Sequence, residues 1–215
     1  MHIIDQSMAQ LTLYPEPNAE ALTLPGADLQ LHRCPDLGLD PDYLLEVLLR
    51  ETPWRQETIT LYGKTHLQPR LLAWYGEPDA SYRYSGTTYQ PLPWTPLLDA
   101  LRCRMEALAR ASFNSVLLNY YRDGRDSMGL HADDEPELGP EPVIASLSLG
   151  ELRTLYFRHK RDKAIRGLDI ALPHGSVLLM RGTTQSHWKH GIRKLRGPCG
   201  ARLNLTFRLI DTGAR

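Results

Sequence analysis

"ARLNLTFRLI", residues 201–210, alternates apolar and polar side chains one by one, which is the pattern of a β-strand with two unlike faces. The apolar face would carry Leu203, Leu205, Phe207 and Leu209, and the polar face Arg202, Asn204, Thr206 and Arg208. A face that simply meets solvent would account for the polar set. Arginine also suits a bidentate grip on a carboxylate, so the same face would equally suit a site for an anionic ligand.

Other short strand candidates lead up to this stretch, separated by Gly, Pro and charged turns. They are "NSVLLNYY" (114–121), "PVIASLSLG" (142–150), "RTLYFRHK" (153–160), "LDIALP" (168–173) and "GSVLLMRG" (175–182). No helix is expected after residue 112. Six strands without intervening helices predict an antiparallel sandwich or jelly roll, with the earlier helices on one face of it.

Two helices are expected before these strands, each opened by a capping residue and a proline. "DPDYLLEVLLRETP" (40–53) has Asp40 and Pro41 at its start and a buried stripe of Leu44, Val47 and Leu48. "TPLLDALRCRMEALARA" (95–111) has Thr95 and Pro96 at its start and a stripe of Leu97, Leu101, Met105 and Leu108. Between them, residues 57–76 and 82–91 have the turns and apolar runs of hairpins.

Composition indicates an ordinary globular protein of 215 residues, long enough to bury a core. The first residues lack the basic start and apolar run of a signal peptide, and no stretch approaches the length of a membrane span. Three scattered cysteines favour neither a disulfide framework nor a cysteine zinc site. We therefore expect a reducing, cytoplasmic compartment.

The net charge of zero conceals an asymmetry between the two parts of the chain. Residues 1–150 hold 11 Lys and Arg against 21 Asp and Glu, and residues 151–215 hold 14 against 4. The basic side chains concentrate in residues 158–167 and 193–197. Either the two parts pair with each other across the fold, or the basic part meets an anionic partner.

"GLHADDEPELG", residues 129–139, has a histidine followed closely by three acids. It is either a solvated acidic loop or half of a metal site, because His131 and Asp133 would point to the same side of an extended segment. A second histidine would complete the two-histidine, one-carboxylate set of non-haem Fe(II) oxygenases. His187 and His190 are the candidates, and their odd separation predicts that only one of them faces the metal.

Three motifs occur in an order that resembles the AlkB family of alkylation-repair dioxygenases, most closely its DNA-repairing members. They are "LNYYRDGRDSMGLHADDE" (118–135), "SLSLGELRTLYFRHK" (146–160) and "RLNLTFR" (202–208), and the resemblance runs from about Leu61 to Leu209. It implies a mainly β protein with flanking helices, built on a double-stranded β-helix with an N-terminal helix and hairpin lid for nucleotide recognition. Residues 1–35 would be an extension, 36–215 one domain, and 55–92 the recognition hairpins.

The resemblance also implies residue roles. Fe(II) would be bound by His131, Asp133 and His190, the last in preference to His187. The cosubstrate 2-oxoglutarate would be bound by Asn119, Tyr121, Arg202, Asn204 and Arg208. The alkylated base and its strand would be contacted by Tyr62, Arg70, Tyr82, Tyr84, Ser85, Asp134 and Glu135, with Tyr62 as a wedge at the hairpin "LYG" (61–63) where relatives often have Phe.

The implied activity is oxidative demethylation of N1-methyladenine and N3-methylcytosine in single- or double-stranded DNA. It would use Fe(II), 2-oxoglutarate and O2, and release formaldehyde, succinate and CO2 after the base is extruded from its stack. The basic "RHKRDK" (158–163) would contact phosphate. The alternatives are the same chemistry on methylated RNA or protein, or a nucleic-acid binding module without catalysis. We expect a monomer with no membrane association.

Overall fold

The protein is described from a computed structural model, in which residues 19–61, 64–80, 82–84, 87–211 and 213 are placed. The elements of the N-terminal part are β1 (Ala19–Leu22), β2 (Asp28–His32), α1 (Pro41–Glu51), β3 (Thr58–Leu61), β4 (Lys64–Leu67), β5 (Leu71–Gly76), β6 (Tyr82–Tyr84), β7 (Thr87–Tyr89) and α2 (Pro96–Ala109). The rest are β8 (Ser115–Tyr121), β9 (Met128–His131), the 3-10 helix η1 (Pro136–Leu138), β10 (Ile144–Gly150), β11 (Arg153–His159), β12 (Asp169–Leu172), β13 (Ser176–Arg181), α3 (Thr184–His187), β14 (Trp188–Ile192) and β15 (Arg202–Arg208).

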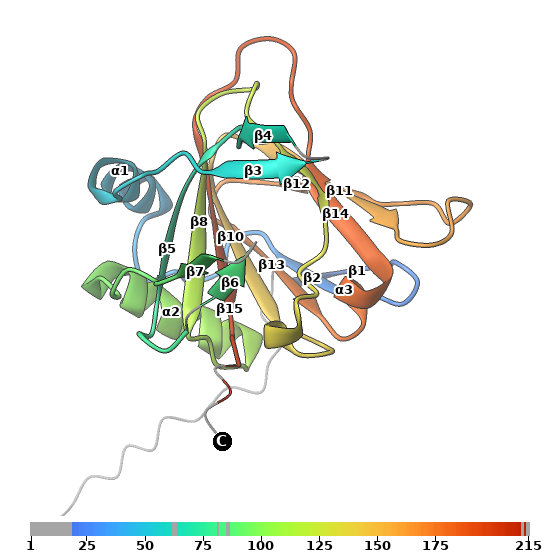
Figure 1. Cartoon of the computed structure of the whole chain (residues 1–215), viewed down its shortest axis with the longest axis horizontal. Coiled ribbons are helices and arrows are strands. Elements are labelled where there is room, and N and C mark those ends of the chain that lie inside the picture. The colour runs from blue at the N-terminus through green and yellow to red at the C-terminus, as the bar shows by residue number, and fades with distance from the viewer. Residues whose placement is uncertain (1–18, 62–63, 81, 85–86, 212, 214–215) are drawn as a thin grey trace, which may run out of the picture.

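Two antiparallel sheets form the body of the molecule (Figure 1). The larger has the strand order β1-β2-β13-β10-β15-β8-β5, and the smaller has the order β12-β11-β14-β9. Apolar side chains from both sheets share one core cluster, so the sheets pack face to face. The mainly β architecture with flanking helices and a jelly-roll core is confirmed, and each of the six predicted strands is present.

β15 has the alternation that its sequence predicts. Leu203, Leu205 and Phe207 are fully buried and belong to the core cluster that also contains the apolar stripes of α1 and α2. The polar residues of β15 point the other way, into the space between the sheets, and line a pocket there. The polar face therefore lies inside the molecule. Leu209 differs from the prediction and is 51% exposed, because the strand ends at Arg208 and the alternation ends with it.

Both predicted helices form and cover the outer face of the larger sheet (Figure 1). The carboxylate of Asp40 accepts from the backbone amides of Asp42 and Tyr43, and the Thr95 hydroxyl accepts from that of Leu98. The buried face of α2 is rotated about the helix axis relative to the predicted one. Its buried residues are Leu98, Leu101, Met105 and Ala109, whereas the predicted Leu97 and Leu108 are only partly buried. Apolar residues also lie on either side of this buried face, so the apolar periodicity alone does not determine which side of α2 packs against the sheet.

Residues 19–35, expected to be part of an extension, are integral to the larger sheet. β2 pairs with β13 along five residues, and Leu29 and Leu31 are buried in the core between the sheets. Residues 1–18 lie outside the described part of the chain. A second difference lies after residue 112, where the short helices η1 and α3 occur although none was expected.

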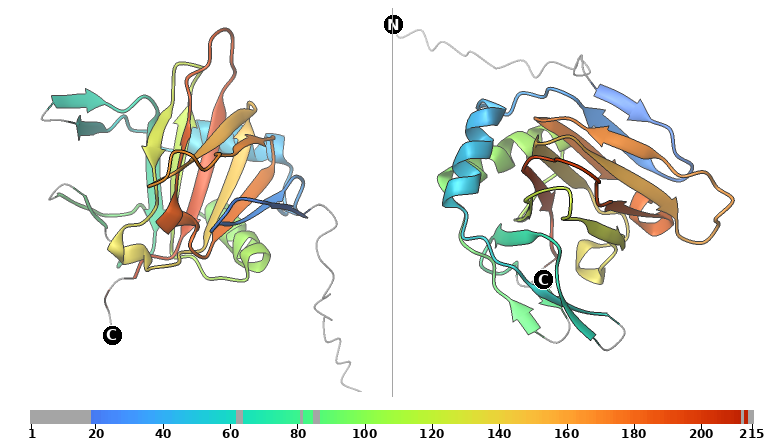
Figure 2. Two further views of the ribbon diagram at one scale, coloured as in Figure 1. Left: turned by 90° about the vertical axis from the view of Figure 1, so that its right-hand side faces the viewer. Right: turned by 90° about the horizontal axis from the view of Figure 1, so that it is seen from above.

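The hairpins β3–β4 and β6–β7 stand off the two sheets on the same side of the molecule (Figure 2). Each is a separate two-stranded unit, paired within itself. Within the described part of the chain, no helix is long and apolar enough to cross a membrane.

Candidate metal centre and adjoining pocket

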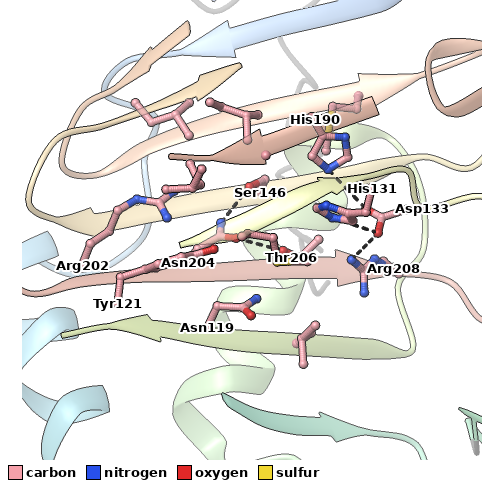
Figure 3. Close-up of a pocket in the computed structure, with 17 residues that line it drawn as sticks. Asn119, Tyr121, His131, Asp133, Ser146, His190, Arg202, Asn204, Thr206 and Arg208 are labelled. Carbon is pink, nitrogen blue, oxygen red and sulfur yellow. Dashed lines mark hydrogen bonds and ion pairs between the residues drawn. The ribbon is translucent and has the colours of Figure 1, made fainter. Parts of the chain in front are cut away.

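His131, Asp133 and His190 converge at one point between the sheets (Figure 3). His131 ends β9 and lies directly opposite His190 in the β9–β14 ladder, and Asp133 follows two residues later. The potential ligand atoms of the three residues all lie within 4.8 Å of one another. A direct pairing of adjacent strands thus brings together residues that lie 59 positions apart in the chain.

The donor atoms fit a divalent metal such as Fe(II). His131 Nε2 lies 3.8 Å from one carboxylate oxygen of Asp133, and His190 Nε2 lies 3.9 Å from the other. The other ring nitrogen of His131 is 3.0 Å from the Gly129 carbonyl, the outward hydrogen bond that orients a metal-binding imidazole. Among the described residues, buried Oδ2 of Asp133 has no hydrogen-bond partner. Two imidazoles and one carboxylate are the set used by non-haem iron oxygenases.

The electrostatics keep Asp133 and His190 in their ligand forms. Burial alone would raise the pKa of Asp133, but the charges of Arg208, His131 and His190 outweigh it and lower the pKa to about 2. Burial, together with the neighbouring charge of His131, lowers the pKa of His190 to about 3. Asp133 is therefore a carboxylate and His190 a neutral imidazole at neutral pH, as metal binding requires.

Two further side chains fix Asp133. Arg208, at the end of β15, donates from Nη2 to its carboxylate at 2.8 Å. Gln185, buried in α3, accepts from its backbone amide at 3.0 Å. The sequence did not indicate Gln185, because a glutamine in a four-residue helix carries no pattern that marks it as a support for a ligand in another segment.

Replacing Arg208 with glutamine is expected to weaken divalent metal binding by about 10- to 100-fold, since loss of a residue that orients a ligand has effects of that size. Isothermal titration with Mn(II) measures the change. Arg208→Lys, which keeps a charged donor, should lose less. Equal affinity in the wild type and Arg208→Gln would show that Asp133 needs no support from β15.

A pocket extends between the sheets from this centre, and the residues predicted to bind the cosubstrate all line it. They are Asn119 and Tyr121 from β8 and Arg202, Asn204 and Arg208 from β15. β8 and β15 are ladder partners, with Tyr121 opposite Arg202 and Asn119 opposite Asn204. Figure 3 shows Arg202 at one end of this row and Arg208, beside the metal ligands, at the other.

Arg202 provides the main positive charge at the far end of the pocket. It is 1% exposed, and its Nη2 donates to the hydroxyl of Ser148 at 2.9 Å. Its buried Nε and Nη1 have no partner among the described residues. Burial lowers the pKa of Arg202 to about 10, so the group stays charged at neutral pH. A buried cation with free donors fits a carboxylate ligand.

The residues predicted to contact substrate are less closely grouped. Arg70 is buried and donates from Nε to Asn119 at 2.6 Å, so it lies behind the pocket wall. Asp134 is 55% exposed beside the metal centre and forms an ion pair of 2.6 Å with Lys160. Glu135 caps η1. Tyr62 and Ser85 lie outside the described residues. Tyr82 and Tyr84 are described only as backbone positions of β6.

The other histidines in the described part of the chain do not belong to this group of metal ligands. His187 ends α3, where its ring stacks on that of His159 at 6.2 Å, with Nδ1 3.0 Å from the Thr183 carbonyl. His174 accepts from the backbone amide of Gly150, and His32 is buried in β2. His190 lines the site and His187 does not, but the predicted reason does not apply, because His187 lies in α3 and only His190 lies on the strand β14.

The sequence and the fold are similar to those of known proteins. The model of the 2OG-Fe(II) oxygenase superfamily matches residues 41–208. Alpha-ketoglutarate-dependent dioxygenase alkB homolog 3 of Mus musculus is 43% identical over 179 residues, 80% of this chain and 62% of the relative. DNA oxidative demethylase ALKBH2 of Homo sapiens is 39% identical over 158 residues, 71% of this chain and 60% of the relative. The chain therefore spans about three fifths of the length of these relatives.

A solved structure of OsALKBH1 has the same fold, with a TM-score of 0.60 and 17% sequence identity over 89% of this chain and 99% of that one. The superfamily is named for Fe(II) and 2-oxoglutarate, which agrees with the metal ligands and the buried arginine of the pocket. Sequence, fold and site agree that the chain belongs to the AlkB family of 2OG-Fe(II) oxygenases.

Proposed function

We propose that this protein is an oxidative demethylase that removes methyl groups from N1-methyladenine and N3-methylcytosine in DNA. The observation that supports it most directly is the set His131, Asp133 and His190 beside a pocket that ends at a buried, partly unpaired arginine. That combination suits a metal and a dicarboxylate together. The names of its relatives, a DNA oxidative demethylase among them, favour an alkylated nucleic acid as substrate.

Fe(II) with 2-oxoglutarate and O2 supplies the oxidation of the N-methyl group, with succinate, CO2 and formaldehyde as products. His131, Asp133 and His190 hold the metal. Arg202 receives the distal carboxylate of 2-oxoglutarate, and Asn119, Tyr121 and Asn204 shape the wall around it. Arg208 holds Asp133 and adds positive charge at the end near the metal. Burial between two sheets excludes water from the cosubstrate, which strengthens each of these contacts.

The base would enter from the exposed side of the metal centre. The carboxylate of Asp134, half exposed there, can accept from the exocyclic amino group of a methylated adenine or cytosine, with Glu135 next to it. The tyrosines and Ser85 of the hairpins (Tyr62, Tyr82, Tyr84, Ser85) would stack on or border the base, with Arg70 behind them. The basic stretch 158–163, at the end of β11 and in the loop that follows it, would contact phosphate.

The test uses an oligonucleotide carrying one N1-methyladenine, incubated with Fe(II), ascorbate and O2. Its mass is followed with and without 2-oxoglutarate, and Asp133→Ala serves as the matched inactive variant. Loss of 14 Da (about one methylene, as methyl is replaced by hydrogen) only with 2-oxoglutarate and the wild type supports the proposal. Succinate formed without any change in the oligonucleotide would refute the substrate. Absence of succinate would refute the proposed enzymatic activity and favour a nucleic-acid binding module without catalysis.

RNA is the second candidate substrate, because the basic loop and an extruded base are features that either nucleic acid would use. Matched DNA and RNA oligomers with the same lesion, compared by kcat/KM, separate the two. A reducing, cytoplasmic compartment remains part of the proposal, since Cys34, Cys103 and Cys199 are all free. The expected monomer is checked by light scattering.

Tyr62→Ala is expected to reduce demethylation in duplex DNA by about tenfold while changing the single-stranded rate less than about threefold, because a wedge matters only where a base must leave a stack. The wedge role is what the resemblance of the "LYG" stretch to the AlkB family implies. Rates on the same lesion in both contexts measure it, with Tyr62→Phe as the conservative control. Equal losses on both substrates would remove the wedge role.

A further inference from the structure

Arg153 is a buried cation that the proposed mechanism does not use. It opens β11 in the smaller sheet, is 1% exposed, and is among the largest fully buried side chains of the protein. It does not line the pocket itself. A fully buried arginine is rare unless something requires it, so its surroundings decide what it does.

Its hydrogen bonds all go to backbone carbonyls. Nη2 donates to Asp126 at 2.9 Å and to Arg193 at 2.6 Å, and Nη1 donates to Asp123 at 3.3 Å. These carbonyls belong to the loop that follows β8 and to the end of β14. Arg153 thereby ties the segment next to Tyr121 to the smaller sheet.

No carboxylate among the described residues forms an ion pair with Arg153. The nearby carboxylate of Asp126 is taken by Arg122, which donates to both of its oxygens at 2.8 and 2.9 Å. The buried Nε of Arg153 has no partner among the described residues either. The positive charge of Arg153 is therefore solvated by backbone dipoles and is not neutralised, which is an unfavourable state for a buried ion.

Tyr121 connects this charge to the pocket. Its ring is packed against two guanidinium groups, with the Cζ of Arg202 5.1 Å and the Cζ of Arg153 5.6 Å from the ring centroid. Arg202 and Tyr121 come from the larger sheet and Arg153 from the smaller one. The charge of Arg153 lowers the pKa of Arg202, which is what a like charge in electrostatic contact does.

The two buried guanidinium groups beside the Tyr121 ring repel each other. An anion bound between the sheets would offset this repulsion. We propose that Arg153 is a positioning residue for the distal carboxylate of 2-oxoglutarate: it fixes Tyr121 and the loop 122–127, and it adds a second buried positive charge behind Arg202. This inference rests on the proposed function. According to this inference, the charge of Arg153 makes the protein prefer a cosubstrate with two carboxylates over one with a single carboxylate.

The test compares binding of 2-oxoglutarate with binding of 2-oxopentanoate, which has the same five-carbon chain but a methyl group where the distal carboxylate would be. Both are titrated into the Mn(II)-loaded protein without O2, by calorimetry. The ratio of the two affinities is expected to fall about tenfold in Arg153→Met, the size of a charge interaction over several ångströms in a partly polar interior. Arg153→Lys, which keeps the charge, should fall less than about threefold.

Arg193→Met is the matched control, because Arg193 also lies over a tyrosine, 4.0 Å from the ring centroid of Tyr156, but on the surface. The ratio of the affinities for 2-oxoglutarate and 2-oxopentanoate in Arg193→Met should equal that of the wild type. In turnover, Arg153→Met should raise KM for 2-oxoglutarate and leave kcat and KM for the oligonucleotide within about twofold, an effect that a charge at the cosubstrate predicts. Should Arg153→Met not fold, Arg153→Gln gives the same comparison.

An unchanged affinity ratio in a folded Arg153→Met or Arg153→Gln would overturn the inference and leave Arg153 a purely structural residue. Equal losses for both ligands would do the same. A wild-type protein that does not prefer 2-oxoglutarate over 2-oxopentanoate would instead refute the proposed function on which the inference rests.

Discussion

His190→Ala is expected to abolish both metal binding and turnover, while His187→Ala retains both. His190 Nε2 lies 3.9 Å from Asp133 and the ring is buried, and an alanine side chain offers no donor atom in place of the lost ligand. Loss of a residue that merely orients a ligand costs 10- to 100-fold, so loss of the ligand itself should weaken the metal by on the order of a hundredfold or more. Calorimetric titration with Mn(II) and succinate formation with Fe(II) measure the two effects.

His187→Ala is a demanding control because the two histidines are close in sequence and share the same chemistry. His187 belongs to α3, hydrogen-bonds to the Thr183 carbonyl and stacks on His159, away from the metal centre. Its loss should change stability only slightly, as a partly exposed position allows. A variant pair with the opposite behaviour, active His190→Ala and inactive His187→Ala, would falsify the ligand assignment.

The sequence predicts the strands of the jelly roll well because local alternation determines which residues share a face. In β15 the alternation of Arg202, Leu203, Asn204 and Leu205 gives both the strand and its two faces. It does not tell whether the polar face meets solvent or a second sheet, because both produce the same period of two. That distinction depends on β11, β12 and β14 lying opposite, which is a property of the whole fold.

The spacing of His131 and Asp133 places them on one side of an extended segment, whereas the choice of His190 over His187 came from the resemblance to the AlkB family. The residues that support the metal ligands and the cosubstrate pocket could not be predicted. Gln185 and Arg153 act through contacts that cross between segments or sheets, with Asp133 and with Tyr121 respectively. A single sequence contains no local signal for such contacts. The same reason explains the α2 stripe, where Leu98 and not Leu97 is buried, since the direction of packing is set by the sheet below.

Arg202→Met is expected to weaken 2-oxoglutarate binding by between about thirtyfold and a few thousandfold, because truncating one partner of a buried ion pair costs about 2–5 kcal/mol. Arg202 is 1% exposed and donates to the Ser148 hydroxyl. Among the described residues, it is the only cation that lines the pocket at the end away from the metal ligands. Methionine has a similar length and no charge, so it fills the space without replacing the carboxylate contact. Calorimetry on the Mn(II)-loaded variant measures the affinity.

The metal should respond differently from the cosubstrate in this variant. Arg202 lies six residues before Arg208 on β15, and Arg208 alone of the two contacts Asp133. Mn(II) affinity should therefore remain within about threefold of the wild type, well below the 10- to 100-fold loss expected when a residue that orients a ligand is changed. Arg166→Met, at an exposed site in the loop between β11 and β12, controls for loss of a positive charge in general. Retention of 2-oxoglutarate affinity in Arg202→Met would mean that the distal carboxylate binds elsewhere, and parallel loss of Mn(II) would mean that the two ends of the pocket are not independent.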